Sequence, residues 1–207
     1  MRLAVFGATG RIGHPLVELA LADGHEVTAY ARAPERVGIP HRQLRLVGGD
    51  LDAASVEQTL AGQDAVLVAL AAGNGTLARF DRLALPAMQA DGPRRIVSLV
   101  GAAVRMPGDP DTSTLRLMSA MMRLIPNGLL ADASAHAADL AASGLDWTLV
   151  RAANFADRAP TGRIRAEPGF AMRFSAQITR GDLAAFMLDA ATQQRFVQQA
   201  PMVCNAP

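Results

Sequence analysis

Cysteine, long apolar runs and an excess of charge of one sign are nearly absent from this sequence. The single cysteine, Cys204, excludes an internal disulfide and is typical of a reducing compartment. The longest apolar run, residues 65–72, is far shorter than the roughly 20 residues that a membrane-spanning helix needs. The formal net charge of +1 is spread along the chain and indicates no nucleic-acid surface.

We expect no signal peptide, because Met1 and Arg2 lead directly into a short strand that ends at glycine. We therefore expect a cytoplasmic protein with no membrane and no nucleic-acid partner. We also expect no metal site. The sequence leaves open whether the protein is a monomer or a homodimer.

The length of 207 residues fits one domain. Short apolar runs alternate with helical patterns, which predicts a single-domain, Rossmann-like α/β fold with helices on both faces of a doubly wound, mainly parallel sheet. Right-handed crossovers favour the strand order 3-2-1-4-5-6. We expect one NAD(P)-binding domain over residues 1–207, in which residues 152–207 contribute a small substrate-side segment.

The chain is organised around residues 7–13 (GATGRIG), which follow the apolar run 3–6 and open a helix. A strand, a glycine turn and a helix start in this order are typical of dinucleotide sites, where free N–H groups face the pyrophosphate. A purely structural turn is the alternative, since turns also need glycine. The residues expected to bind the cofactor here are Gly7, Thr9, Gly10, Arg11 and Ile12.

Cofactor choice is expected to depend on the residues after the second strand, 26–30. An NAD site usually has an acidic residue there, but this chain has Tyr30 and Ala31, with Arg32 and Arg36 just beyond. Guanidinium groups bind phosphate through paired donors and stay charged. We therefore expect NADP(H) to be preferred over NAD(H), although both arginines could instead be solvated surface residues.

Two later strands are expected to end beside the cofactor. The third strand, 44–47, runs into Gly-Asp-Leu, where Asp50 can accept from the adenine amine and Leu51 follows. An ordinary turn or helix cap is the alternative for Asp50. The apolar run 65–70 predicts a central strand buried on both faces. It is followed by small residues that let backbone lie close to the cofactor, so Leu70, Ala71 and Ala72 complete the predicted site.

The rest of the chain supplies further elements and two polar residues of interest. Helices are expected over about 53–61, 77–90, 115–125 and 129–142, strands over 95–99 and 146–151, a possible strand over 162–166, and a last helix from Thr179. Pro86 should kink or split its helix, and Thr179 with Asp182 predicts a capping box. The methionine-rich helix 115–125 is either core or subunit-interface packing or a lid over the substrate. Ser98 is expected to bond within its strand, and His136 to lie on a solvated helix face, with a catalytic role as the alternative for each.

With these pieces in place the chain resembles the NmrA-like atypical short-chain dehydrogenases, and among them the biliverdin reductase B and flavin reductase group. The motifs that carry the resemblance are 7–13 (GATGRIG), 30–37 (YARAPERV), 49–51 (GDL), 143–151 (SGLDWTLVR), 161–162 (TG) and 178–188 (ITRGDLAAFML). The resemblance implies that the first four regions hold NADP(H). It also implies that Val100, Gly101, Ala153 and Asn154 lie around the nicotinamide and the substrate.

The departures from this resemblance bear on the chemistry. The wider superfamily uses a Tyr-x-x-x-Lys pair, but alignment through residues 143–145 places Leu129 and Ala133 at those positions. The small reductases tend to have a serine after strand five and a histidine after strand six, where this chain has Gly101 and Asn154. No catalytic residue is therefore assigned.

Three functions remain after these departures. The leading one is an NADPH-dependent reductase that transfers hydride to a flavin-like or other conjugated small-molecule acceptor, because alignment of donor and acceptor is then the protein's main task. The second is a non-catalytic sensor that binds NADP(H). A nucleotide-sugar epimerase ranks last, since it needs a larger substrate lobe and the missing tyrosine.

Overall fold

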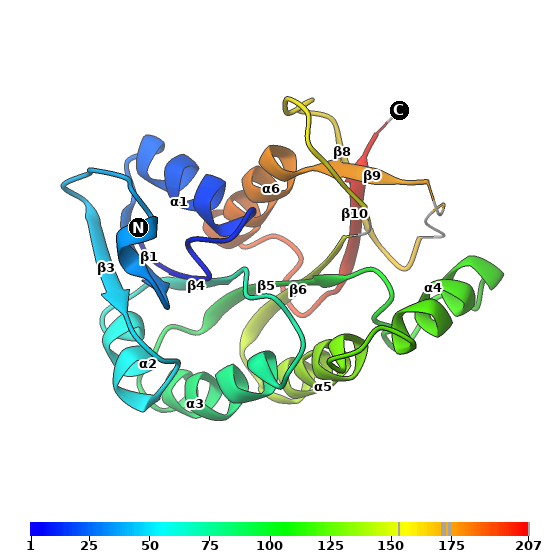
Figure 1. Ribbon diagram of the computed structural model, residues 1–207, viewed down its shortest axis with the longest axis horizontal. Helices are drawn as coiled ribbons and strands as arrows, with labels where there is room; N and C mark the ends of the chain where they lie inside the picture. Colours follow the sequence, from blue (N-terminus) through cyan, green and yellow to red (C-terminus); the bar gives the residue numbers. More distant parts are fainter. Residues whose placement is uncertain (153, 171–172, 174, 207) are drawn as a thin grey trace.

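Eight strands form one sheet in the computed structural model, in the order β3-β2-β1-β4-β5-β6-β10-β8 (Figure 1). The structure describes all residues except 153, 171–172, 174 and 207. The strands of this sheet are β1 (Arg2–Phe6), β2 (Glu26–Ala31), β3 (Leu44–Gly48), β4 (Ala65–Val68), β5 (Arg95–Gly101), β6 (Asp146–Ala152), β8 (Ile164–Pro168) and β10 (Pro201–Asn205). Neighbouring strands pair in parallel, except that β8 runs antiparallel to β10.

The predicted fold class and the order 3-2-1-4-5-6 are confirmed, and β10 and β8 extend the sheet beyond the prediction. A separate pair is formed by β7 (Asn154–Ala156) and β9 (Gln177–Thr179). The helices are α1 (Gly13–Ala22), α2 (Ala53–Leu60), α3 (Thr76–Ala90), α4 (Ser113–Arg123), α5 (Leu129–Ala142) and α6 (Arg180–Thr192), with a short 3-10 turn η1 (Pro34–Arg36).

The helices cover the sheet from both sides. In Figure 1, α1 and α6 lie on one face and α2, α3 and α5 on the other. Every residue of β4, from Ala65 to Val68, is fully buried, as expected for a strand in the middle of a parallel sheet. Each face has its own apolar core, in which the strands supply alternate side chains to the two sides.

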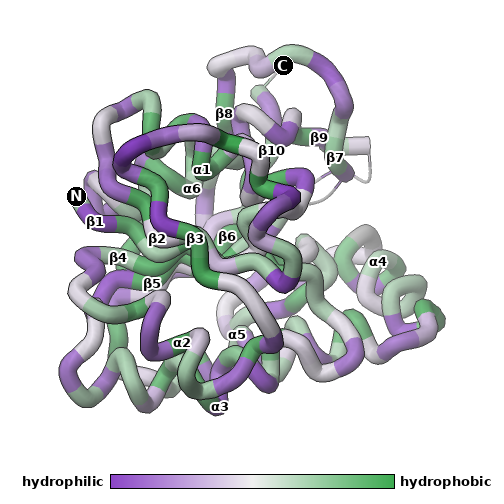
Figure 2. The backbone as a smooth tube through the Cα atoms, turned by 60° about the vertical axis from the view of Figure 1, so that its left-hand side comes forward, coloured by the Kyte–Doolittle hydropathy of each residue, from purple (hydrophilic) through white to green (hydrophobic). Residues whose placement is uncertain are grey.

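The helix α4 lies at the margin of the molecule in both Figure 1 and Figure 2. Its methionines separate into two groups: Met118 and Met122 pack against the core, whereas Met121 is exposed. Leu117 and Leu124 are exposed on the outer side as well. The helix therefore has one apolar stripe facing the protein and a second one facing outward.

Of the two outcomes expected at Pro86, the split is wrong, because α3 runs as one element through the proline. Proline removes the N–H that would bond to the carbonyl of Arg82. Both Pro86 and Arg82 are exposed. Water can therefore hydrogen-bond to the freed carbonyl on the solvent side of the helix, where carbonyl groups tilt outward.

The start of α6 corrects the predicted capping box. The Thr179 hydroxyl accepts from the N–H of Asp182 at 3.1 Å, but the N–H of Thr179 donates to Asn205 Oδ1 rather than to Asp182. The buried Asp182 carboxylate instead accepts from the N–H groups of Thr161 and Gly162, both at 2.9 Å, and from Asn205 Nδ2 at 2.6 Å. Asp182 therefore joins the 161–162 loop and β10 to α6.

Burial alone would raise the pKa of Asp182, but the hydrogen bonds from Thr161, Thr179, Gly162 and Asn205 outweigh it and hold the pKa well below its usual value. Asp182→Asn should lower the free energy of unfolding at neutral pH by about 2–4 kcal/mol. A neutral amide oxygen accepts weaker hydrogen bonds than a carboxylate, and the amide NH2 group would face N–H donors that it cannot bond. The carboxylate stabilises the fold fully above the unfolded pKa of about 4. That stabilisation is lost as the pH falls through the lower folded pKa.

Urea unfolding over a pH series tests this expectation. Wild-type stability should fall below about pH 4 more steeply than that of Asp182→Asn. Asp23→Asn, which changes an exposed carboxylate at the end of α1, is the control and should follow the wild type. Parallel curves for wild type and Asp182→Asn would contradict the assignment.

Candidate functional site

The glycine turn after β1 is packed so tightly that two of its glycines have no room for a side chain. A Cβ atom on Gly7 would lie 2.6 Å from the carbonyl oxygen of Ala69, and Gly7 has a φ of +88°. A Cβ atom on Gly13 would lie 2.1 Å from the carbonyl oxygen of Gly7. At Gly10 the same atom would lie 3.1 Å from the Gly7 oxygen, which is a close but less severe contact. The turn is therefore folded back on itself ahead of α1.

Several backbone donors at this turn have no protein acceptor. Within the described part of the chain, the N–H groups of Thr9, Arg11 and Ile12 donate to no protein atom, whereas that of Gly10 donates to the Gly7 carbonyl at 2.9 Å. The helix α1 begins directly afterwards, so its partial positive charge adds to these donors. This arrangement fits a bound anion such as a pyrophosphate.

The end of β2 presents the two arginines expected to select the cofactor. Arg32 and Arg36 are exposed, and among the described residues neither guanidinium has a hydrogen-bond or ion-pair partner. Tyr30 is buried, its ring packs on Phe6 at 5.4 Å between centroids, and its hydroxyl donates to the Gly49 carbonyl at 3.0 Å. Burial, followed by the nearby Asp50, raises the pKa of Tyr30. The tyrosine is thus part of the packed interior, whereas both arginines are accessible to a ligand.

The loops after β3 and β4 lie at the same edge of the sheet. Asp50 is exposed, and its carbonyl is held by the Ser55 hydroxyl at 2.8 Å, while Leu51 packs into the core. After β4, Ala71 is exposed and Leu70 and Ala72 are half-buried. Parallel strand order therefore places the predicted cofactor residues of four adjacent strands along one carboxyl edge.

The predicted substrate-side residues differ from one another in their exposure. Val100 and Gly101, expected after strand five, are the last two residues of β5, and Val100 is buried while Gly101 is exposed. Asn154 is exposed at the start of β7, and its side-chain amide donates to the Ala176 carbonyl at 3.2 Å. Ala153 lies outside the described residues. The backbone of Gly101, rather than the Val100 side chain, is thus available to a ligand.

The loop after β5 is anchored by a buried arginine. Arg151 of β6 donates to the Val104 carbonyl at 3.1 Å, to Asp109 Oδ1 at 2.8 Å and to the Ala200 carbonyl at 3.0 Å. Burial would raise the pKa of Asp109, but the Arg151 hydrogen bonds and the N–H of Met106 lower it overall. The loop after β5 is therefore fixed to the sheet at Val104 and Asp109.

The structure corrects the expectations for His136 and Ser98. His136 is fully buried: its Nδ1 lies 2.7 Å from Asp81 Oδ1 and its Nε2 lies 2.6 Å from Ser98 Oγ. Burial raises the pKa of Asp81, against the opposing effect of His136. All three side chains are at most 4% exposed, so this chain of hydrogen bonds lies inside the protein and ties α3, α5 and β5 together.

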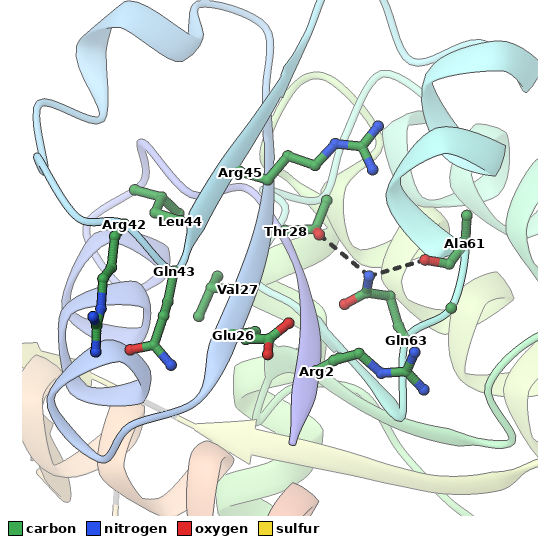
Figure 3. Close-up of a pocket in the computed structure, with 11 residues that line it drawn as sticks. Arg2, Glu26, Val27, Thr28, Arg42, Gln43, Leu44, Arg45, Ala61 and Gln63 are labelled. Carbon is green, nitrogen blue, oxygen red and sulfur yellow. Dashed lines mark hydrogen bonds between the residues drawn. The ribbon is translucent and has the colours of Figure 1, made fainter.

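A cavity of about 460 Å³ lies at the opposite, amino-terminal edge of the sheet (Figure 3). It is lined by Arg2, Arg42 and Arg45 together with Glu26. Figure 3 shows Arg42 and Arg45 pointing away from each other, and Arg2 is paired with Asp64 at 3.0 Å. These cations do not converge on one point, so we assign no ligand to this cavity.

Two further features are absent from the part of the chain that the structure describes. No group of three or more His, Cys, Asp or Glu side chains there is arranged to hold a metal ion. Among the same residues, no helix combines the length and the apolar character that crossing a membrane requires.

Comparison with known proteins bears directly on the glycine turn. A model of a family described as NAD(P)H-binding matches residues 7–194. That range begins at the first glycine of the turn and ends after α6, so it contains the four loops at the carboxyl edge.

Solved structures share the whole fold. An exported protein of Burkholderia pseudomallei, provisionally so named, is 28% identical, with a TM-score of 0.75 over 99% of each chain. A short-chain dehydrogenase/reductase of Veillonella parvula in complex with NADP is 17% identical, with a TM-score of 0.82 over 99% of this chain and 94% of that one. A Streptococcus pneumoniae protein, provisionally described as an NADH-flavin reductase, is 21% identical, with a TM-score of 0.72 over 100% of both chains.

Proposed function

This chain belongs to the NAD(P)H-binding family, and on that basis we propose that it is an NADPH-dependent reductase that transfers hydride to a flavin-like or other conjugated acceptor. The observation that carries the proposal is that the sequence cannot supply a catalytic Tyr-Lys pair, whichever alignment is chosen. The sequence contains no lysine, and its single tyrosine is Tyr30, buried under the Gly49 loop. The resemblance to the flavin reductase group of the NmrA-like proteins supports the same acceptor class.

Each part of the proposed site has a binding task. The free N–H groups of Thr9, Arg11 and Ile12 would hold the pyrophosphate, and Arg32 with Arg36 would bind the 2′-phosphate. Asp50 would accept from the adenine amine. The loop 70–72 would lie along the nicotinamide, which supplies the hydride when bound.

The acceptor class follows from the missing proton donor. Hydride transfer to a ketone produces an alkoxide, which needs an acid positioned beside it. Hydride transfer to a ring nitrogen of flavin leaves a weakly basic anion that water can protonate. Leu129 and Ala133 stand at the positions of the Tyr-Lys pair that the wider superfamily uses. The protein would therefore contribute by aligning the nicotinamide ring with the flavin ring and by excluding other relative orientations of the two.

Nicotinamide oxidation in the presence of different acceptors tests the proposal. We expect NADPH to be consumed with FMN, FAD, riboflavin or quinones, and not with simple aldehydes or ketones. Tight NADPH binding without turnover on any acceptor would favour the sensor function instead. Turnover of ketones at rates similar to those of flavins would contradict the argument from the missing acid.

A further inference from the structure

The segment between β4 and α3, residues 69–75, is held by a carboxylate from another helix, α5. Asp132 Oδ2 accepts from the N–H of Gly73 at 2.8 Å and of Leu77 at 3.1 Å, and Oδ1 accepts from the N–H of Ala78 at 3.0 Å. Asp132 is only 7% exposed. Three backbone donors thus replace the water that this buried charge has lost.

The helix α3 has no side-chain cap of its own. Its N-cap residue is Gly75, which adopts a left-handed φ of 71° and has no side chain to accept from the first turn. The Asp132 carboxylate instead accepts hydrogen bonds from the N–H groups of the first turn that have no partner within the helix. A second tie lies nearby, where the N–H of Asn74 donates to the Asn127 carbonyl at 2.8 Å. The start of α5 and the residues before it therefore hold this loop from outside.

The same loop is in direct contact with the glycine turn. A Cβ atom on Gly7 would lie 2.6 Å, and one on Gly10 3.8 Å, from the Ala69 carbonyl oxygen. Packed backbones of this kind leave no space for independent movement, so a displacement of one loop shifts the other. Leu70, Ala71 and Ala72 continue directly from this contact toward Gly73.

We propose that Asp132 is a positioning residue for hydride transfer: it fixes the loop 69–73 and, through that loop, the nicotinamide half of the cofactor. This inference rests on the proposed function, in which the pyrophosphate binds the turn after β1 and the nicotinamide lies along the loop after β4. The adenosine half lies across β2 and β3, whose loops make no hydrogen bond with Asp132 in the described part of the chain.

Titration of Asp132→Asn with two ligands tests this role. The variant keeps the shape of the side chain, but its neutral amide cannot accept all three hydrogen bonds. NADPH should bind about tenfold more weakly, because misplacement of the loop disturbs the nicotinamide contacts. Adenosine 2′,5′-bisphosphate, which carries only the adenosine half, should bind as in the wild type. Equal affinity for NADPH in variant and wild type, or parallel loss of both ligands, would overturn the inference.

Two further variants complete the test. Asp182→Asn is the matched control, since Asp182 is another buried carboxylate that accepts loop N–H groups; it should lose stability and leave both affinities unchanged. Asp132→Glu keeps the charge one methylene further out and should weaken NADPH about threefold, with the fragment unaffected. If Asp132→Asn does not fold, titration of Asp132→Glu with the same two ligands tests the inference instead.

Failure of the proposed function would look different from failure of this inference. If the wild type bound neither NADPH nor the adenosine fragment, the dinucleotide site itself would be wrong, and the role of Asp132 would be overturned with it. If the wild type bound both ligands and Asp132→Asn bound both with unchanged affinity, only the positioning role would be overturned.

Discussion

Replacing Gly10 with aspartate is expected to raise the Kd for NADPH about a thousandfold while the protein stays folded. A carboxylate about 4 Å from the pyrophosphate charge, at an effective dielectric constant of about 20, costs about 4 kcal/mol, which is this factor in affinity. Folding should survive because a Cβ atom at Gly10 lies 3.1 Å from the Gly7 oxygen, a contact that a small shift relieves, and Gly10 does not have a left-handed φ. Isothermal titration gives the affinity, and circular dichroism reports the fold.

Two variants at the same position separate charge from volume. Gly10→Asn has nearly the shape of Gly10→Asp without its charge, and Gly10→Ala adds only the Cβ atom. We expect the order of affinity to be wild type, then Gly10→Ala, then Gly10→Asn, with Gly10→Asp far below. Unchanged affinity of a folded Gly10→Asp would refute the assignment of this turn to the pyrophosphate.

Replacing both Arg32 and Arg36 with alanine is expected to abolish a strong preference for NADPH over NADH. Both guanidinium groups are exposed and have no partner among the described residues, so they can turn toward a 2′-phosphate. Two charge-assisted contacts of about 1.5–3 kcal/mol each give a preference of about a hundredfold or more, less the part that solvent screens. The double variant should bind NADH almost as the wild type does, and the wild-type preference should shrink as salt is added.

A second pair of arginines provides the control for charge. Arg42 and Arg45 are also exposed and lack partners in the described structure, but they lie at the amino-terminal edge of the sheet. Replacing them with alanine changes the net charge by the same amount and should leave the cofactor preference intact. If the wild type bound both cofactors equally, or if Arg32→Ala/Arg36→Ala lost NADH and NADPH in parallel, these arginines would be ordinary surface residues.

Buried polar residues are one part of the molecule that the sequence did not predict. Asp81 lies in the stripe of α3 that contains Leu77, Phe80 and Ala84, and His136 lies in a similar stripe of α5. A polar residue on an apolar helix face is a signal that it is buried with a partner. The partner itself was not predictable, because Asp81, His136 and Ser98 lie on three elements that meet only when the chain folds.

The local sequence pattern was sufficient to predict those features of the fold that depend on residues close together in the chain. The glycine turn, the buried β4, the Thr179 cap and the alternation of strands and helices are all set within a few residues, and the hand of the crossovers then leaves the strand order 3-2-1-4-5-6. Tertiary structure alone decided that Asp132 caps α3, that Asp182 binds a loop about 20 residues away, and that β10 joins the sheet. A carboxylate or a short strand has many acceptable partners along a chain, and only burial of the surrounding apolar surface selects one of them.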